Sequence, residues 1–155
     1  MIIIGIDPGL AKTGFGVIDG ARCIKYGMIV TPPDVPVQRR LKTIFHEINA
    51  VLDVHKPREL AIERLFFSRN VSSAIDVSHA RGVVLLAASE HDLEVFEYTP
   101  NQVKQAVTGS GRADKKQVQK MVRVMFDINE TMPADAADAV AVALCHANMR
   151  LPQNL

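Results

Sequence analysis

Four acidic side chains stand where a folded core would not hold a charge without a partner. Asp7 ends a strongly apolar run, and Glu63 ends another. Asp135 and Asp138 lie three positions apart in an alanine-rich stretch. That spacing puts both carboxylates on one face of a helix, with Cβ atoms about 5–6 Å apart. The small alanines around them would let the helix approach a sheet closely, so these four residues are the first candidates for chemistry.

A cluster of four carboxylates requires cations. Two carboxylates about 4 Å apart repel each other by on the order of 4 kcal/mol at an effective dielectric constant of about 20. The natural partners are hard divalent ions with oxygen ligands, so we expect Mg²⁺, two ions per subunit, with Mn²⁺ as a substitute. Two such ions about 3.5–4 Å apart can activate water and stabilise the leaving oxygen in phosphodiester hydrolysis. The residue types therefore predict a metal-dependent nuclease.

Each acid also has a simpler interpretation when it is taken alone. The positive end of a helix would stabilise Asp135, and Asp7 would suit a turn before Gly9. Glu63, directly after an apolar strand, is harder to explain in this way. We favour the catalytic interpretation because all four acids occur together with a basic segment.

This basic segment lies between residues 104 and 123. It holds six basic residues and one acid, a local charge of +5 in a chain whose net charge is +1. Such asymmetry is typical of a face that binds a polyanion such as DNA, and we predict that Arg112 and Lys116 take part. The loop at residues 109–112 resembles a phosphate-binding turn but lacks a Walker pattern. The alternative is an ordinary solvated helix face.

The apolar pattern predicts the elements that must position these residues. Short β-branched or alternating runs predict strands at residues 2–6, 14–18, 23–30, 59–63 and 93–98. Apolar residues at helical spacing predict a helix from near Pro36 through residue 52, and others near residues 71–90, 100–107, 118–126 and 134–149. Three closely connected strands followed by two β-α-β crossovers predict an α/β fold, a mixed sheet with helices on both faces.

The bulk properties predict a single domain over residues 1–155. Hydrophobic residues make up 48% of the chain, which is normal for a globular protein. Cys23 and Cys145 fit no metal-ligand spacing and are expected to be buried thiols in a reducing compartment. Residues 1–6 are too short for a signal peptide, and we expect no apolar run of about 20 residues that could span a membrane. We therefore expect a cytoplasmic protein without membrane contact.

Several short motifs, taken in order, resemble the RuvC family of bacterial Holliday junction resolvases over nearly the whole chain. They lie at residues 5–9, 13–17, 61–66, 70–74, 80–82, 98–100, 103–107, 109–115 and 135–139. The resemblance implies a ribonuclease H-like fold, with a five-stranded sheet in the order 3-2-1-4-5. It also implies an endonuclease that resolves four-way DNA junctions in recombination and repair. The family makes paired symmetric nicks that leave 5′-phosphates.

The resemblance also implies roles for single residues. The family's metal-binding catalytic carboxylates fall on Asp7, Glu63, Asp135 and Asp138. Lys104 and Lys115 fall on lysines that contact DNA phosphates. Phe66 falls on an aromatic residue that engages bases near the crossover. Phe67 beside it leaves open which ring does so, and either ring could instead belong to the core.

Members of the family act as homodimers on junction DNA, together with the branch-migration proteins RuvA and RuvB. The resemblance implies that the helix at residues 71–90 forms the dimer interface. Ser78, Ala80 and Gly82 are small residues that would permit close packing of two such helices.

Two positions depart from the family's pattern. Leu10 stands where many members carry a small hydroxyl residue, so no hydroxyl role can be assigned there. Asp135 is a histidine in some members, and an aspartate here implies a site made only of carboxylates, without an imidazole base at this position.

Three alternatives remain open at this point. Short ribonuclease H-like enzymes of the YqgF type share the Asp7-Pro8-Gly9 start but act on RNA. Sugar kinases and actin-like ATPases have a similar first phosphate hairpin, although they have two lobes and longer chains. A junction-binding module without catalysis would keep the basic segment and need no metal.

Overall fold

The sheet begins with three strands joined by short turns, as their apolar alternation predicts. The computed structural model describes residues 1–65 and 71–150. Over these ranges the elements are β1 (Ile2–Asp7), β2 (Lys12–Asp19), β3 (Arg22–Val30), α1 (Val37–His55), β4 (Glu59–Glu63), α2 (Val71–Glu90), β5 (Glu94–Tyr98), α3 (Pro100–Thr108), α4 (Lys115–Met125) and α5 (Ala134–Arg150). Each predicted strand and helix is present, with small differences at the ends.

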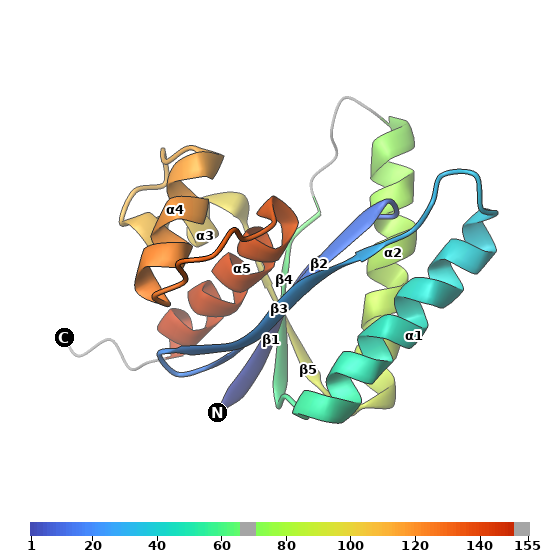
Figure 1. Cartoon of the computed structure of the whole chain (residues 1–155), viewed down its shortest axis with the longest axis horizontal. Helices are drawn as coiled ribbons and strands as arrows, with labels where there is room; N and C mark the ends of the chain where they lie inside the picture. The colour runs from blue at the N-terminus through green and yellow to red at the C-terminus, as the bar shows by residue number, and fades with distance from the viewer. Residues whose placement is uncertain (66–70, 151–155) are drawn as a thin grey trace.

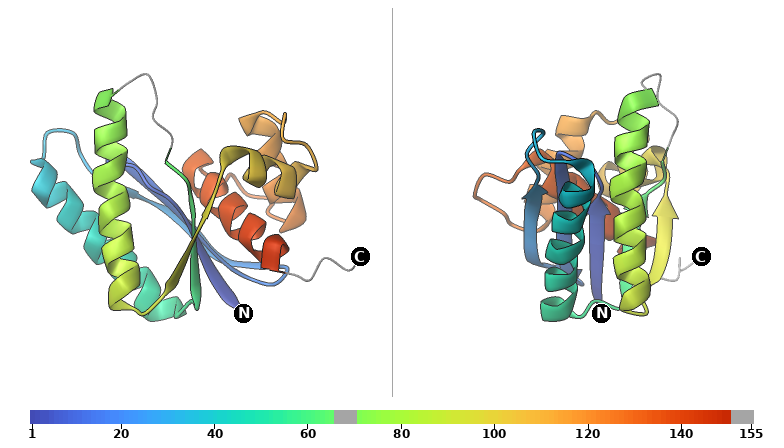
Figure 2. Two further views of the ribbon diagram at one scale, coloured as in Figure 1. Left: turned by 180° about the vertical axis from the view of Figure 1, so that it is seen from behind. Right: turned by 90° about the vertical axis from the view of Figure 1, so that its right-hand side faces the viewer.

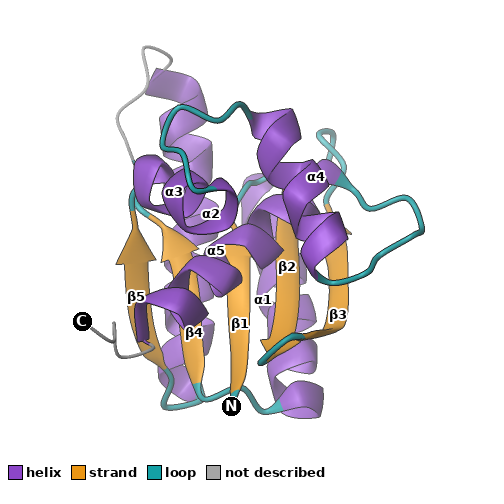
Figure 3. Ribbon diagram, turned by 90° about the vertical axis from the view of Figure 1, so that its left-hand side faces the viewer, coloured by secondary structure: helices purple, strands orange, loops and turns teal. Residues whose placement is uncertain are grey.

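The five strands form one mixed sheet in the order β3-β2-β1-β4-β5. β2 pairs with β1 and β3 in antiparallel fashion. β4 pairs in parallel with β1 on one side and with β5 on the other. The structure thus confirms the predicted sheet and its strand order, which Figure 3 shows face-on.

Helices cover both faces of this sheet. α1 and α2 lie against one face, and α5 lies against the other, with α3 and α4 packed outside α5 (Figures 1 and 2). Successive side chains of a strand point to opposite faces. Ile4 and Ile6 of β1 accordingly join the core beneath α1 and α2, whereas Ile3 joins the core beneath α5. The odd-numbered positions of β1, including Asp7, therefore belong to the α5 face.

α4 begins earlier than its apolar stripe indicates. The side chain of Asp114 accepts a hydrogen bond from the backbone N–H of Gln117, and the Gln117 side chain accepts one from the backbone N–H of Asp114. This reciprocal cap starts the helix at Lys115 rather than at residue 118. The lysine is thereby fixed in the first turn of the helix.

α2 is apolar on two sides. Ala80 and Val84 are fully buried against the core. Val71, Ile75 and Leu86 on other turns are 69%, 50% and 55% exposed. The expectation that Ala80 would lie at a dimer interface is therefore wrong, because this residue already packs inside its own chain.

The expectation of no apolar run long enough to span a membrane also needs correction. α2 has 20 residues and a mean hydropathy of 1.2 in its most apolar window, so by length and composition alone it could cross a membrane. One such helix is weak evidence, because core helices of soluble proteins meet the same criterion. Cys145 is buried as expected, but Cys23 is only half-buried.

Candidate active site

Asp7 and Glu63 lie at the carboxyl ends of neighbouring parallel strands. β1 and β4 are in register up to the pair Ile6 and Ile62, so the next residue on each strand is one of these two acids. Both follow an apolar residue of the α1 and α2 face and therefore lie on the opposite face, toward α5. The parallel pairing explains why acids far apart in sequence come together.

Glycines let α5 approach the sheet closely. A Cβ atom on Gly5 of β1 would lie 2.0 Å from the carbonyl oxygen of Ala139. A Cβ atom on Gly14 of β2 would lie 2.0 Å from the carbonyl oxygen of Asp135. No other residue type fits such distances without movement of the backbone. Gly5 and Gly14 thus let the first turns of α5 lie directly over the end of β1, where Asp7 lies.

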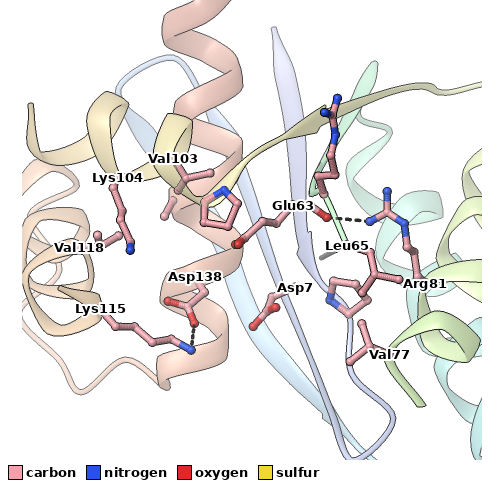
Figure 4. A pocket seen from close by; sticks show the side chains of 14 residues that line it. Asp7, Glu63, Leu65, Val77, Arg81, Val103, Lys104, Lys115, Val118 and Asp138 are labelled. Carbon is pink, nitrogen blue, oxygen red and sulfur yellow. Dashed lines mark hydrogen bonds and ion pairs between the residues drawn. The ribbon is translucent and has the colours of Figure 1, made fainter. Parts of the chain in front are cut away.

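This packing brings three acids together. Asp7, Asp135 and Asp138 each offer one carboxylate oxygen, and these oxygens all lie within 4.8 Å of one another. Glu63 lies outside this group of three but lines the same cavity as Asp7 and Asp138 (Figure 4). The predicted set of four therefore lies at one place, with three oxygens already spaced for a shared cation.

The electrostatics of the cluster favour a cation. Burial, together with the neighbouring carboxylates of Asp138 and Asp135, raises the pKa of Asp7 to about 7. Burial, followed by the charge of Asp138, also raises the pKa of Glu63. Negative charge is thus costly here, and an all-oxygen donor set suits a hard divalent ion. The residues present therefore fit Mg²⁺ or Mn²⁺.

One cation of the chain already reaches the cluster. The Lys115 ammonium forms an ion pair of 2.9 Å with Oδ2 of Asp138, and this hydrogen bond raises the pKa of Lys115. The side-chain amide of Gln119 lies 3.4 Å from the other Asp138 oxygen. Asp138 is therefore oriented by contacts from α4.

The cavity beside the acids has a volume of about 470 Å³ and carries both charges. Lys104 and Lys115 line it from α3 and α4. Arg64 and Arg81 line it from the other side. The acidic oxygens, with the ammonium groups of Lys104 and Lys115 beside them, suit a phosphodiester held over a metal site.

The other predicted DNA-binding residues are placed differently. Arg112 lines a separate cavity between α4 and the loop before it, together with Lys120. Lys116 is exposed on α4 and lines neither of these two cavities. Phe66 and Phe67 lie outside the described residues. The roles of all four remain predictions.

Comparison with known proteins decides the family. The family model for crossover junction endodeoxyribonuclease RuvC matches residues 3–146. This chain belongs to the RuvC family. A RuvC from Alkaliphilus oremlandii is 50% identical over 153 residues, which cover 96% of this chain and 93% of that relative.

Solved structures of RuvC share the fold of this chain. Thermus thermophilus RuvC in complex with a Holliday junction substrate has a TM-score of 0.90 and 39% identity, and the match covers 96% of this chain and 94% of that one. The yeast mitochondrial Holliday junction resolvase has a TM-score of 0.62 at 11% identity over 94% and 78% of the two chains, a likeness of fold alone. These neighbours confirm the ribonuclease H-like fold expected from the sequence.

Sequence reasoning about this RuvC family member missed Arg81. Its guanidinium lies in the wall of the cavity and donates a hydrogen bond of 2.7 Å to the backbone carbonyl of Glu63. The sequence did hold a signal. Between Asp76 and Glu90, Arg81 is the only residue with a permanently charged side chain, in a mostly apolar stretch. Its partner, a backbone carbonyl, has no signature in the sequence.

Proposed function

We propose that this chain is a Mg²⁺-dependent endonuclease that resolves four-way Holliday junctions in DNA recombination and repair. Membership of the RuvC family and the likeness to a RuvC bound to a Holliday junction substrate support the activity and the substrate. The observation that carries the catalytic part is the meeting of Asp7, Asp135 and Asp138 oxygens within 4.8 Å, beside Glu63. We propose the Asp7, Glu63, Asp135 and Asp138 carboxylates as the ligands of two ions.

The metal ions, when bound, would activate water and stabilise the leaving oxygen. The remaining work belongs to the protein. β1 and β4 hold Asp7 and Glu63 at the carboxyl ends of two neighbouring strands, and α5, which packs closely on the glycines of β1 and β2, supplies the other two acids. Lys104 and Lys115 supply positive charge where a scissile phosphate would lie. Hydrolysis of this kind leaves 5′-phosphates at each nick.

The paired nicks require two active sites, so we propose a homodimer. The exposed apolar side chains Val71, Ile75 and Leu86 of α2 support a contact through this helix. A Cβ atom on Gly82 of the same helix would meet nothing within 4 Å, so this turn offers room for close approach of a second helix. RuvA and RuvB are proposed as the branch-migration partners of the dimer on family grounds.

The decisive experiment is cleavage of a mobile four-way DNA junction with and without Mg²⁺, with the cuts mapped on all four strands. Wild type should nick two opposing strands symmetrically and leave ends that DNA ligase can join. Asp7→Asn should bind the junction with little change and cut it at least about 100-fold more slowly, because one metal ligand is lost.

The matched control is Asp19→Asn, the same chemical change at the opposite end of the β1 and β2 pair. This variant should cut like wild type. Normal cutting by Asp7→Asn would mean that the acid cluster is not the catalytic site. Preferential cleavage of RNA, or hydrolysis of ATP by the wild type, would favour one of the alternative families.

A further inference from the structure

Arg81 makes two close contacts in the wall of the cavity. Its Nη1 donates to the backbone carbonyl of Glu63 at 2.7 Å, and its Nη2 forms an ion pair of 2.7 Å with Oε1 of Glu97 on β5 (Figure 4 shows the first contact). The Arg81 side chain is only 11% exposed. Its charge is therefore largely committed to partners within the protein.

The Glu63 carbonyl stands at a point where the sheet ends. The described pairing of β4 with β1 stops at Ile62. On the β5 side, the backbone N–H of Arg64 still donates to the carbonyl of Tyr98 at 2.7 Å. Arg81 holds the carbonyl of Glu63 between these two points, so the peptide after Glu63 is fixed from two directions.

A buried guanidinium is retained only where its hydrogen bonds are well made. Arg81 uses the fork geometry of its guanidinium to join α2, the end of β4 and β5 at once. The acidic group at this junction is the Glu63 side chain, which shares the cavity with Asp7 and Asp138.

We propose that Arg81 is a positioning residue, which fixes the backbone of Glu63 and so directs its carboxylate toward the metal-binding acids. This inference rests on the proposed function, because it concerns the same site. Arg81 itself would contact neither the metal nor the DNA. Removing a group that orients a metal ligand costs roughly 10- to 100-fold in metal affinity or activity.

The competing explanation is that Arg81 merely anchors α2. A second anchor of α2 provides the matched control: His91, just after the far end of the helix, accepts or donates a hydrogen bond of 2.9 Å with Asp53 of α1. His91→Asn should loosen α2 without touching Glu63. A purely structural role predicts that variants at Arg81 and His91 behave alike once their thermal stabilities are compared.

The test combines calorimetric titration of the free protein with Mn²⁺ and single-turnover cleavage of junctions at saturating enzyme. Arg81→Gln should weaken Mn²⁺ binding and raise the Mg²⁺ midpoint of cleavage, each by about 10-fold, while junction affinity without metal stays within about twofold. Glu97→Gln, at a 42% exposed position, should cause a smaller change in the same direction.

Arg81→Lys separates charge from geometry. An ammonium keeps the positive charge but lacks the fork that spans both partners, so this variant should resemble Arg81→Gln. Full activity and wild-type metal affinity in Arg81→Lys, or identical behaviour of Arg81→Gln and His91→Asn, would overturn the proposal. Failure of the proposed function would be distinct, because wild type would then bind no metal at the cluster and leave junctions uncut.

Discussion

At the scale of single residues, Lys115 has one partner in the structure, Asp138, and a second under the proposed function, a DNA phosphate. Its ammonium pairs with Asp138, and its charge partly offsets the rise in the pKa of Asp7 and Glu63 that burial and Asp138 cause. The residue therefore partly compensates the acid cluster until stronger cations arrive. Its side chain is also 69% exposed, so DNA phosphate can reach it.

Substitution of Lys115 should reveal the phosphate contact. Lys115→Ala should slow cleavage and reduce the slope of log affinity against log salt by about one, because one phosphate contact is lost. Binding isotherms on a junction at several salt concentrations measure that slope. Lys25→Ala on β3 serves as the control and should leave the slope unchanged. An unaltered slope together with unaltered cleavage would show that Lys115 is a solvated residue of α4.

The acid cluster could be predicted from sequence, whereas the contacts that orient it could not. Asp7 and Glu63 each end an apolar run, and an i, i+3 pair on a helix has a fixed geometry. The partner of Arg81 is a backbone carbonyl, and every residue has one. Only the three-dimensional structure selects which carbonyl it is.

At the scale of elements, the approach of α5 depends on the absence of side chains. The glycines of β1 and β2 meet backbone atoms of α5, and backbone atoms cannot rotate away as a flexible side chain would. The alternation of the strands predicted the sheet and its faces. The alanines around Asp135 and Asp138 predicted that the helix could approach closely, but the strand pattern did not identify the glycines as the other half of this contact, since a glycine in a strand is equally consistent with a bulge.

Gly14→Ala tests this contact. The new methyl would lie 2.0 Å from the Asp135 carbonyl oxygen, so the first turn of α5 must shift. We expect a loss of about 1–3 kcal/mol in the free energy of unfolding, measured by urea denaturation, together with weaker Mn²⁺ binding. Gly111→Ala adds the same methyl where the nearest atoms lie 3.9 Å away and should change neither quantity. Wild-type stability and metal affinity in Gly14→Ala would show that α5 is not held at this distance.

The two apolar sides of α2 explain why the sequence pattern could not correct the placement of Ala80 that the family resemblance implied. Periodicity identifies the buried face only when the opposite face is polar. Here Ala80 and Val84 face the core while Ile75 and Leu86 remain exposed. The pattern alone cannot distinguish the face within the chain from a face available to a partner.

At the scale of the whole molecule, the exposed side chains of α2 predict the oligomeric state. Leu86→Glu places a charge on the proposed dimer face, where burial of an unpaired carboxylate is costly. The variant should sediment as a monomer at micromolar concentration and lose the coordination of its two nicks. Val54→Glu on α1, at a 75% exposed apolar position, should remain dimeric. A wild type that is monomeric under these conditions would exclude the dimer and, with it, the paired mechanism.

The order of the elements also has a consequence for protein synthesis. Chains grow from the N-terminus and fold as their segments emerge. Asp7 and Glu63 therefore exist on the ribosome well before α5 has been made. Because α5 carries the other two acids and covers one face of the sheet, a chain interrupted before Ala134 has half of the proposed catalytic centre and an uncovered core. Under the proposed function, junction cutting would therefore begin only once the sheet is complete and covered by α5.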